Sequence, residues 1–255
     1  MLNKKEKSNS TFSFRRLATR ITDRQVLNGL YTLAVPACYI GPALMIIGDI
    51  TTIVLNHGDS PVQETISWFA AGPFGWLEKL GMLTVAVSFL FIAVHLLRVR
   101  DIRGKNQRDI RLLQADGILL AIVAFGFFLI TFFNTNVIGT IVSFHGLVHQ
   151  IATIMVSVVF YAACLILTRL LIKNPTAKYA GFYSGLTFLV GFGVLFWLGF
   201  SNSRSEYMGL IERLTAGFNL VWIMLVGPQV IKLVNEMRRQ SAATSLSGEL
   251  SSPDN

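Results

Sequence analysis

The sequence predicts an all-α membrane protein, a polytopic bundle of six transmembrane helices. Hydrophobic residues make up 53% of the 255 residues and charged residues only 14%, and the mean hydropathy is +0.56. A soluble domain carries roughly 25% charged residues, whereas about 20 consecutive apolar residues suffice for a helix to cross a bilayer. The apolar residues of this chain are concentrated in six runs of that order, which favours an integral membrane protein over a soluble core.

The predicted spans follow these runs in order. They cover approximately residues 30–55, 76–97, 112–133, 137–171, 179–200 and 209–234. Pro36 and Pro42 fall in the first span and predict a kink there. The fourth run is longer than a span requires, so that helix is expected to tilt or to protrude. Between the first two spans, residues 61–71 show a weak amphipathic pattern that predicts a short helix lying in the membrane interface.

Polar segments flank this membrane domain, which we expect to cover residues 26–236. Residues 1–25 are basic and residues 237–255 are rich in Ser, so both are predicted to be disordered tails. We expect the first span to be retained rather than cleaved as a signal peptide, because no small-residue cleavage site follows it. Cys38 and Cys164 both lie within apolar runs, a placement that provides neither a disulfide framework nor the Cys spacing of a metal site.

Basic residues are distributed unequally between the two sides of the predicted bundle. The tails and the connectors after the second and fourth spans hold 19 of the 22 Lys and Arg residues, and the segments on the other side hold three. This bias predicts that both termini are cytoplasmic. Because the charges border the apolar runs, the net charge of +8 indicates topology rather than nucleic-acid binding. We expect the basic segments to bind anionic lipid headgroups, and no feature predicts the oligomeric state.

Polar side chains from several elements are expected at one level of the membrane, near its outer face. The candidates are Asp49, Asn134, His145, His149, Glu212 and Arg213. Ionisable residues within spans are rare and usually face the bundle interior. The sequence therefore predicts a polar pocket at the outer leaflet.

Two interpretations of the histidine pair are open. His145 and His149 lie one turn apart on the same helix face, and with Asp49, Asp59 or Glu212 they could complete a tetrahedral zinc shell. Such a zinc ion could activate water for the hydrolysis of a lipid. Alternatively, the histidines hydrogen-bond neighbouring helices and stabilise the bundle without any cofactor. We favour the second interpretation, because the pair lacks the adjacent Glu of the metalloprotease motif.

The remaining charged residues within the spans have simpler expected partners. Arg213 can pair with Asp49 or with a lipid phosphate. Of these two, we expect the interhelical ion pair with Asp49. Asp116 lies near the cytoplasmic start of the third span, where we expect it to pair with Arg111 or with interfacial water.

The sequence favours a non-enzymatic protein over an enzyme. A transporter, a lipid-binding protein or an accessory subunit would use the outer pocket, and the alternative is the zinc-dependent lipid hydrolase described above. The sequence contains no serine elbow and no Gly-rich phosphate loop. Transport requires a continuous polar route from the pocket to Asp116 and the cytoplasmic face.

An ordered set of short motifs resembles a known family. The set comprises Ser60-Pro61, Gly72-Pro-Phe-Gly-Trp76, Phe133-Asn-Thr-Asn136, His145-Gly-Leu-Val-His149, Glu212-Arg213 and Trp222. Over roughly residues 30–236 the chain resembles the prokaryotic six-helix membrane proteins of the domain of unknown function 998 family. Members often carry an acidic residue where this chain has Asn136, which weakens a metal or proton site at that position. The resemblance implies a six-span bundle in the cell membrane and implies no particular activity.

Overall fold

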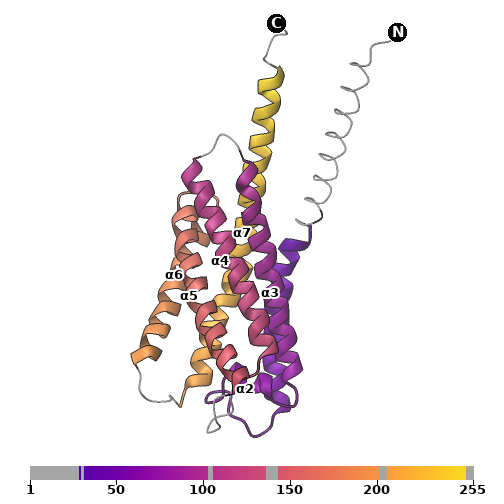
Figure 1. Cartoon of the computed structure of the whole chain (residues 1–255), viewed down its shortest axis with the longest axis vertical. Helices are drawn as coiled ribbons and strands as arrows, with labels where there is room; N and C mark the ends of the chain where they lie inside the picture. Colours follow the sequence, from indigo (N-terminus) through magenta and orange to yellow (C-terminus); the bar gives the residue numbers. More distant parts are fainter. Residues whose placement is uncertain (1–28, 30–31, 103–105, 136–142, 201–205, 251–255) are drawn as a thin grey trace, which may run out of the picture.

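The computed structural model is a bundle of long helices and describes residues 29, 32–102, 106–135, 143–200 and 206–250 (Figure 1). Its elements are a first span at Thr32–Leu55, α2 at Ile66–Ala71, α3 at Gly75–Leu97, the 3-10 helix η1 at Arg98–Asp101, α4 at Gln107–Phe132, α5 at Phe144–Ile172, α6 at Lys178–Phe200 and α7 at Met208–Leu250. No strand occurs among the described residues. Six of the helices are long and apolar enough to cross a membrane, which confirms the predicted fold class of a multi-pass helical membrane protein.

Several helices begin at capping residues rather than at the edges of the apolar runs. The Asn106 side chain accepts a hydrogen bond from the amide of Arg108 at 3.0 Å, so α4 starts five residues before the predicted span. Ser143 caps α5 in the same way, through the amide of Gly146 at 3.0 Å. The segment at 136–142, which includes the start of the predicted fourth span, lies outside the described residues.

The short helix expected in the first loop is present as α2. It begins at Ile66 instead of residue 61 because Thr65, in an extended conformation, accepts a hydrogen bond from the amide of Trp68 at 3.1 Å. Gly72 ends the helix, and its amide donates to the carbonyl of Phe69. The cap therefore determines where α2 lies in the loop.

The last helix extends beyond the predicted domain boundary at residue 236. It is helical as far as Leu250, so it extends into the segment 237–255 that was predicted to be a disordered tail. Lys232 and Glu236 approach to 4.0 Å one turn apart, and Arg238 donates a hydrogen bond to the carbonyl of Arg98. The contact of Arg238 lies beyond the predicted boundary. Of the predicted N-terminal tail, residues 1–25, nothing is described.

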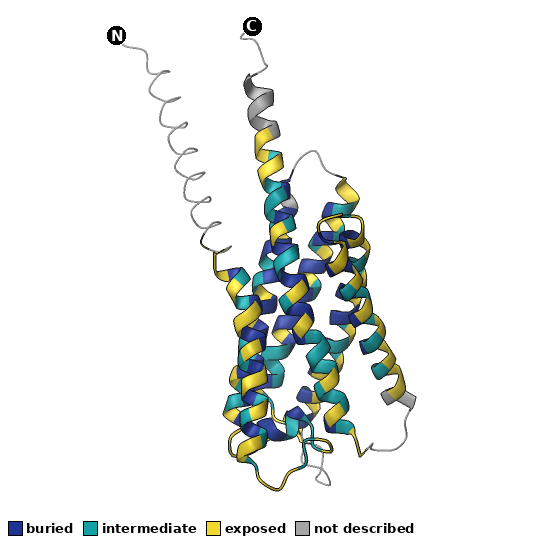
Figure 2. Ribbon diagram, turned by 180° about the vertical axis from the view of Figure 1, so that it is seen from behind, coloured by how far each residue is buried: buried dark blue, intermediate teal, exposed yellow. Residues whose placement is uncertain are grey.

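Neighbouring helices pack in sequence order, and α7 returns to pack against both α6 and α3. The buried residues lie inside the bundle and exposed residues cover its sides (Figure 2). Many of the exposed side chains are large and apolar, as with Phe182 at 73% and Phe125 at 60% exposure. A soluble protein rarely exposes so much apolar surface, so these sides are the surfaces that face lipid.

The first span lies in close contact with α3 through glycines. A Cβ at Gly81 would lie 2.7 Å from the Cα of Met45, and one at Gly48 would lie 2.9 Å from the carbonyl oxygen of Leu77. Ser88 also donates a hydrogen bond to the carbonyl of Ala37 at 2.7 Å. Small residues and interhelical hydrogen bonds of this kind stabilise helix pairs in membranes.

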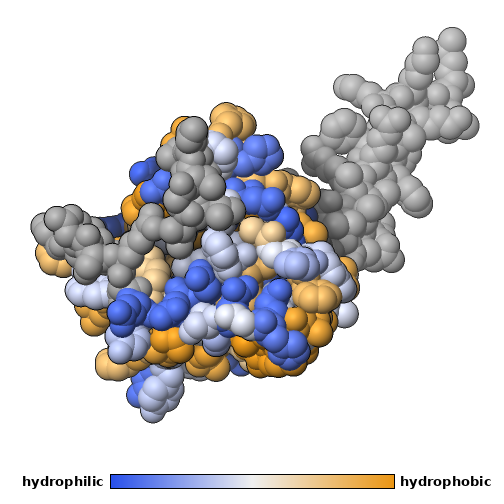
Figure 3. Space-filling model, turned by 90° about the horizontal axis from the view of Figure 1, so that it is seen from below, coloured by the Kyte–Doolittle hydropathy of each residue, from blue (hydrophilic) through white to orange (hydrophobic). Residues whose placement is uncertain are grey.

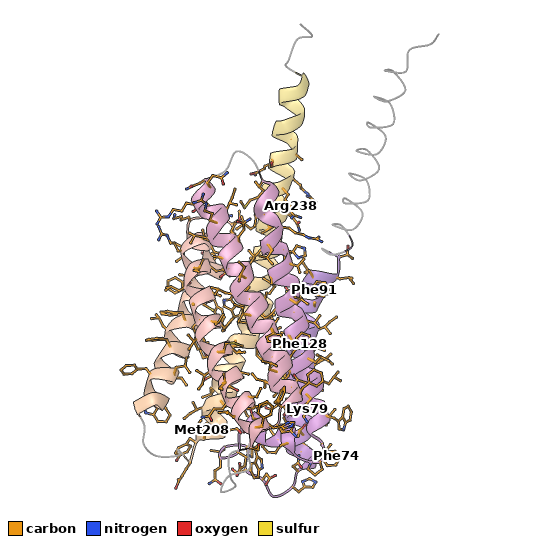
Figure 4. The ribbon with its side chains drawn as sticks, in the orientation of Figure 1. Phe74, Lys79, Phe91, Phe128, Met208 and Arg238 are labelled. Atoms are coloured by element: carbon orange, nitrogen blue, oxygen red, sulfur yellow. The ribbon has the colours of Figure 1, made fainter. Side chains whose placement is uncertain are left out.

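The bundle has two distinct ends. The α2 end carries α2, Phe74, Lys79 and Met208, and the opposite end carries Arg238 (Figure 4). Seen from the α2 end, hydrophilic residues gather across the face of the bundle and hydrophobic residues border them (Figure 3). Which side of the membrane the α2 end faces stays a prediction from the distribution of Lys and Arg.

Candidate functional site at the α2 end

An ion pair between Arg213 and Asp49 lies at the centre of the α2 end. Arg213 in α7 donates from Nε to Oδ2 of Asp49 and from Nη2 to Oδ1, both at 3.0 Å. The two side chains are mostly buried, with 15% and 17% exposure. The bidentate geometry is the strongest that a guanidinium and a carboxylate form. The predicted partners of Arg213 were Asp49 and a lipid phosphate. The structure pairs Arg213 with Asp49.

Arg213 also holds the loop that leads to α2. Its Nη1 donates to the carbonyls of Pro61 and Glu64, both at 2.7 Å, and to that of Gly209 at 3.3 Å. The ring centroid of Phe69 in α2 lies 5.1 Å from the guanidinium carbon. Every guanidinium nitrogen thus donates within the chain.

A second chain of hydrogen bonds starts at the neighbouring residue, Glu212. Its Oε2 accepts from the amide of Ile66 at 2.8 Å, and its Oε1 lies 3.5 Å from the hydroxyl of Ser67. The same hydroxyl lies 3.1 Å from Nε2 of His149, whose Nδ1 lies 2.7 Å from the carbonyl oxygen of Phe133. Because that carbonyl can only accept, Nδ1 carries the hydrogen, and in the neutral imidazole Nε2 accepts from Ser67. The single hydroxyl hydrogen of Ser67 is then not available to Glu212, so Ser67 donates to one of these two partners at a time.

The two histidines have different environments. His149 is buried and uses both ring nitrogens in hydrogen bonds. His145 is exposed, and its ring packs 5.2 Å from that of Phe133 and 6.3 Å from that of Phe144. Within the part of the chain that the structure describes, no three His, Cys, Asp or Glu side chains are placed to hold a metal ion. The set of His145, His149 and Asp49 proposed as zinc ligands is therefore not brought together.

The first of the two asparagines after α4 lies apart from this network. Asn134 is exposed, and Asn136 lies outside the described residues. Of the six candidates from the sequence, the structure thus brings four into one connected region. These four are Asp49, His149, Glu212 and Arg213.

Glu78, in the first turn of α3, is a member of this region that the sequence analysis overlooked. Its exposure is 0%, and neither carboxyl oxygen has a hydrogen-bond partner among the described residues. Glu78 lies next to Asp49 across the helix contact, since a Cβ on Gly48 would lie 3.7 Å from the amide nitrogen of Glu78, and the two side chains interact electrostatically. Glu78 is the one acidic residue in an apolar run of 23 residues, and this isolation was the signal that could have identified it.

The charges of this region do not balance. We call Asp49, Glu78, Glu212 and Arg213 the acidic cluster; it has three carboxyl groups and one guanidinium, and the electrostatic interactions of Glu78 are with the other three members. The N-terminus of α3 favours an anion by about 0.3–1 kcal/mol, but an unpaired buried charge costs several kcal/mol. Chemically, the cluster is therefore suited to bind a small cation, and a proton between Asp49 and Glu78 is the smallest.

Asp116 does not have the environment that the sequence led us to expect. It is fully buried, and both of its carboxyl oxygens lack a hydrogen-bond partner in the described structure. Arg111 is exposed. Five residues along a helix of 3.6 residues per turn rotate a side chain by roughly 140°, so Arg111 faces away from Asp116. The expected pairing with Arg111 or with interfacial water is wrong.

The comparisons with known proteins identify the family. A family model described as a protein of unknown function (DUF998) matches residues 39–228. The chain belongs to the DUF998 family. No curated protein and no solved structure is significantly similar to it. In this DUF998 protein the matched range includes the whole acidic cluster, together with Ser67, His149 and Asp116.

Proposed function

We propose that this DUF998 protein is a non-enzymatic membrane transporter that takes up a proton at the acidic cluster. The observation that carries the proposal is Glu78, a carboxyl group with no exposed surface and no hydrogen-bond donor in the described structure, held beside Asp49. Ionisable groups placed in this way within membrane spans mark proton relays and ion pathways. One proton on the pair supplies the hydrogen bond that two carboxylates cannot make and removes the unpaired charge.

The proposal places the α2 end at the outer face of the cell membrane. The excess of Lys and Arg in the tails and in the connectors at the opposite end supports this orientation. In this arrangement the acidic cluster takes protons from outside, and the basic segments bind anionic lipid headgroups on the cytoplasmic side.

The other functions considered have less support. A lipid-binding role would use Arg213, yet all three of its guanidinium nitrogens donate to groups of the chain itself. A zinc-dependent hydrolase would use His145 and His149, but His149 is engaged at both nitrogens and His145 points to an aromatic surface. His149 and most of the N–H groups of Arg213 are therefore already engaged within the chain.

A charge-displacement measurement tests the proposal without knowledge of the substrate. The full chain is reconstituted into phosphatidylcholine vesicles on a solid-supported membrane, and the bath is acidified. We expect a transient displacement of positive charge into the protein, lost in Glu78→Gln. Glu236→Gln is the control, because Glu236 is nearly half exposed and paired at 4.0 Å with Lys232, and this variant keeps the transient. A wild-type protein without the transient, or Glu78→Gln with an unchanged one, would overturn the proposal.

A further inference from the structure

A second buried carboxyl group lies on the far side of the bundle core from the acidic cluster. Asp116 in α4 is level with the last turns of α3, since a Cβ on the adjacent Gly117 would lie 3.0 Å from Cβ of Leu96. The titratable side chain that interacts with Asp116 is the thiol of Cys164 in α5, which is buried and free. His95, at a similar level of α3, is bonded instead to the carbonyl of Phe91 at 2.8 Å.

An aromatic layer separates Asp116 from the acidic cluster. It consists of Phe89 of α3, Phe127 of α4, Phe160 of α5 and Trp222 of α7, whose ring centroids lie 5.1–6.2 Å apart in four contacts. Eleven residues separate Glu78 from Phe89 along α3, and eleven separate Asp116 from Phe127 along α4, each equivalent to roughly 16 Å of helix. The layer therefore lies about midway between the two carboxyl groups and closes the direct route.

Two polar side chains lie beside this layer. Tyr161 of α5 is buried, its ring packs against Gly191 of α6, and it interacts electrostatically with Cys164 and with the side chain of Asn219 in α7. Asn219 also has a buried Oδ1 without a partner in the described structure. It lies seven residues from Glu212, roughly 10 Å along the helix, in the direction of the acidic cluster.

The Asp116 side of the layer is polar as well. The carbonyl of Cys164 accepts from Ser184 at 2.8 Å and from Thr168 at 2.7 Å, and Ser184 accepts from the indole nitrogen of Trp222 at 3.0 Å. Trp222 thus belongs to the aromatic layer through its ring and to the surroundings of Asp116 through its nitrogen. A rearrangement of this one side chain would change both.

We propose that Asp116 is a second proton-binding carboxyl group, separated from the acidic cluster by the aromatic layer. The inference rests on the proposed function, because it adds the inner site that a proton-linked transporter needs for release on the other side. An ionised Asp116 would be an uncompensated charge in an apolar interior, and such groups take up a proton instead. The proton enters and leaves as such, so no co-reactant is required.

Infrared spectroscopy of the full chain in lipid vesicles tests this inference. Protonated carboxyl groups absorb separately from carboxylates. We expect Asp116→Asn to lose one component of the protonated-carboxyl band, Asp116→Glu to retain it at a shifted position, and Glu78→Gln to lose a different component. Size-exclusion chromatography and circular dichroism establish that each variant is folded. If Asp116→Asn does not fold, the shifted band component of Asp116→Glu tests whether Asp116 is protonated.

The outcomes separate this inference from the proposed function. If Asp116→Asn or Asp116→Glu leaves the band unchanged while Glu78→Gln reduces it, the second site is refuted and the proposed function stands. If Glu78→Gln leaves the band unchanged while the Asp116 variants alter it, the proposed uptake site is refuted. If no variant alters the band, both are refuted.

Discussion

His145 and His149 show how much the function of a residue depends on the direction of its side chain. They are one turn apart on α5, yet His149 joins Phe133 to Ser67 inside the bundle and His145 lies exposed. The angle between them on a helix is only about 40°. That rotation suffices to move a side chain from the interior of the bundle to its surface.

This difference predicts unequal effects of the same substitution. His149→Phe removes two hydrogen bonds and leaves the part-buried carbonyl of Phe133 without this donor, so we expect a loss of unfolding free energy of about 1–3 kcal/mol. His145→Phe, the matched control, should change it by less than about 0.5 kcal/mol. Unfolding of the detergent-solubilised protein measures both. Equal losses, together with zinc found by elemental analysis, would instead support a metal site.

At the scale of elements, α3 and the first span approach each other closely because glycines line the contact. Gly81 faces the backbone of Met45, and backbone atoms cannot move aside as flexible side chains can. Glu78 lies one turn from Gly81 on the same helix. The close packing of these two helices is therefore also what places the Glu78 carboxyl beside Asp49.

Gly81→Ala should accordingly separate the two helices. A Cβ at this position would lie 2.7 Å from Cα of Met45, and overpacking of this kind destabilises by roughly 1–3 kcal/mol. The control is Gly193→Ala in α6, where nothing lies within 4 Å of the added Cβ and the gain in helix propensity is about 0.5–1 kcal/mol. Thermal unfolding should show a lower midpoint for Gly81→Ala and an unchanged or higher one for Gly193→Ala. A midpoint unaffected by Gly81→Ala would contradict the close contact.

At the scale of the whole molecule, the bundle separates two polar levels by an aromatic layer. The acidic cluster lies near the α2 end and Asp116 lies nearer the opposite end, with Phe89 and Trp222 between them. In this conformation the polar route is interrupted rather than continuous. Movement of a proton between the two carboxyl groups would require the layer to rearrange.

The orientation of the whole molecule can be tested by cysteine labelling in intact cells. Ser60→Cys lies in the loop before α2, and Asn174→Cys lies in the basic turn between α5 and α6. The native Cys38 and Cys164 are buried, so they add little background. We expect a membrane-impermeant maleimide to label the first variant in intact cells and the second only after lysis. The reverse pattern would show that the α2 end faces the cytoplasm.

The sequence alone determined the number of helices, their order and one ion pair. Length and apolarity are local properties, so six spans could be read from the runs, and Arg213 had few candidate partners at its level. Boundaries were less well predicted, because caps such as Asn106 and Ser143 lie outside the apolar runs.

Only the tertiary structure decided which side chains face inward. In a soluble helix the polar face marks the outside, but lipid and the bundle core are both apolar, so this signal is absent from membrane spans. Asp116 was therefore expected at the interface and is buried, and Glu78 was not recognised although it lies beside Asp49. The rotation of each span follows from packing between helices, such as Gly81 on Met45, which no single segment of the chain contains.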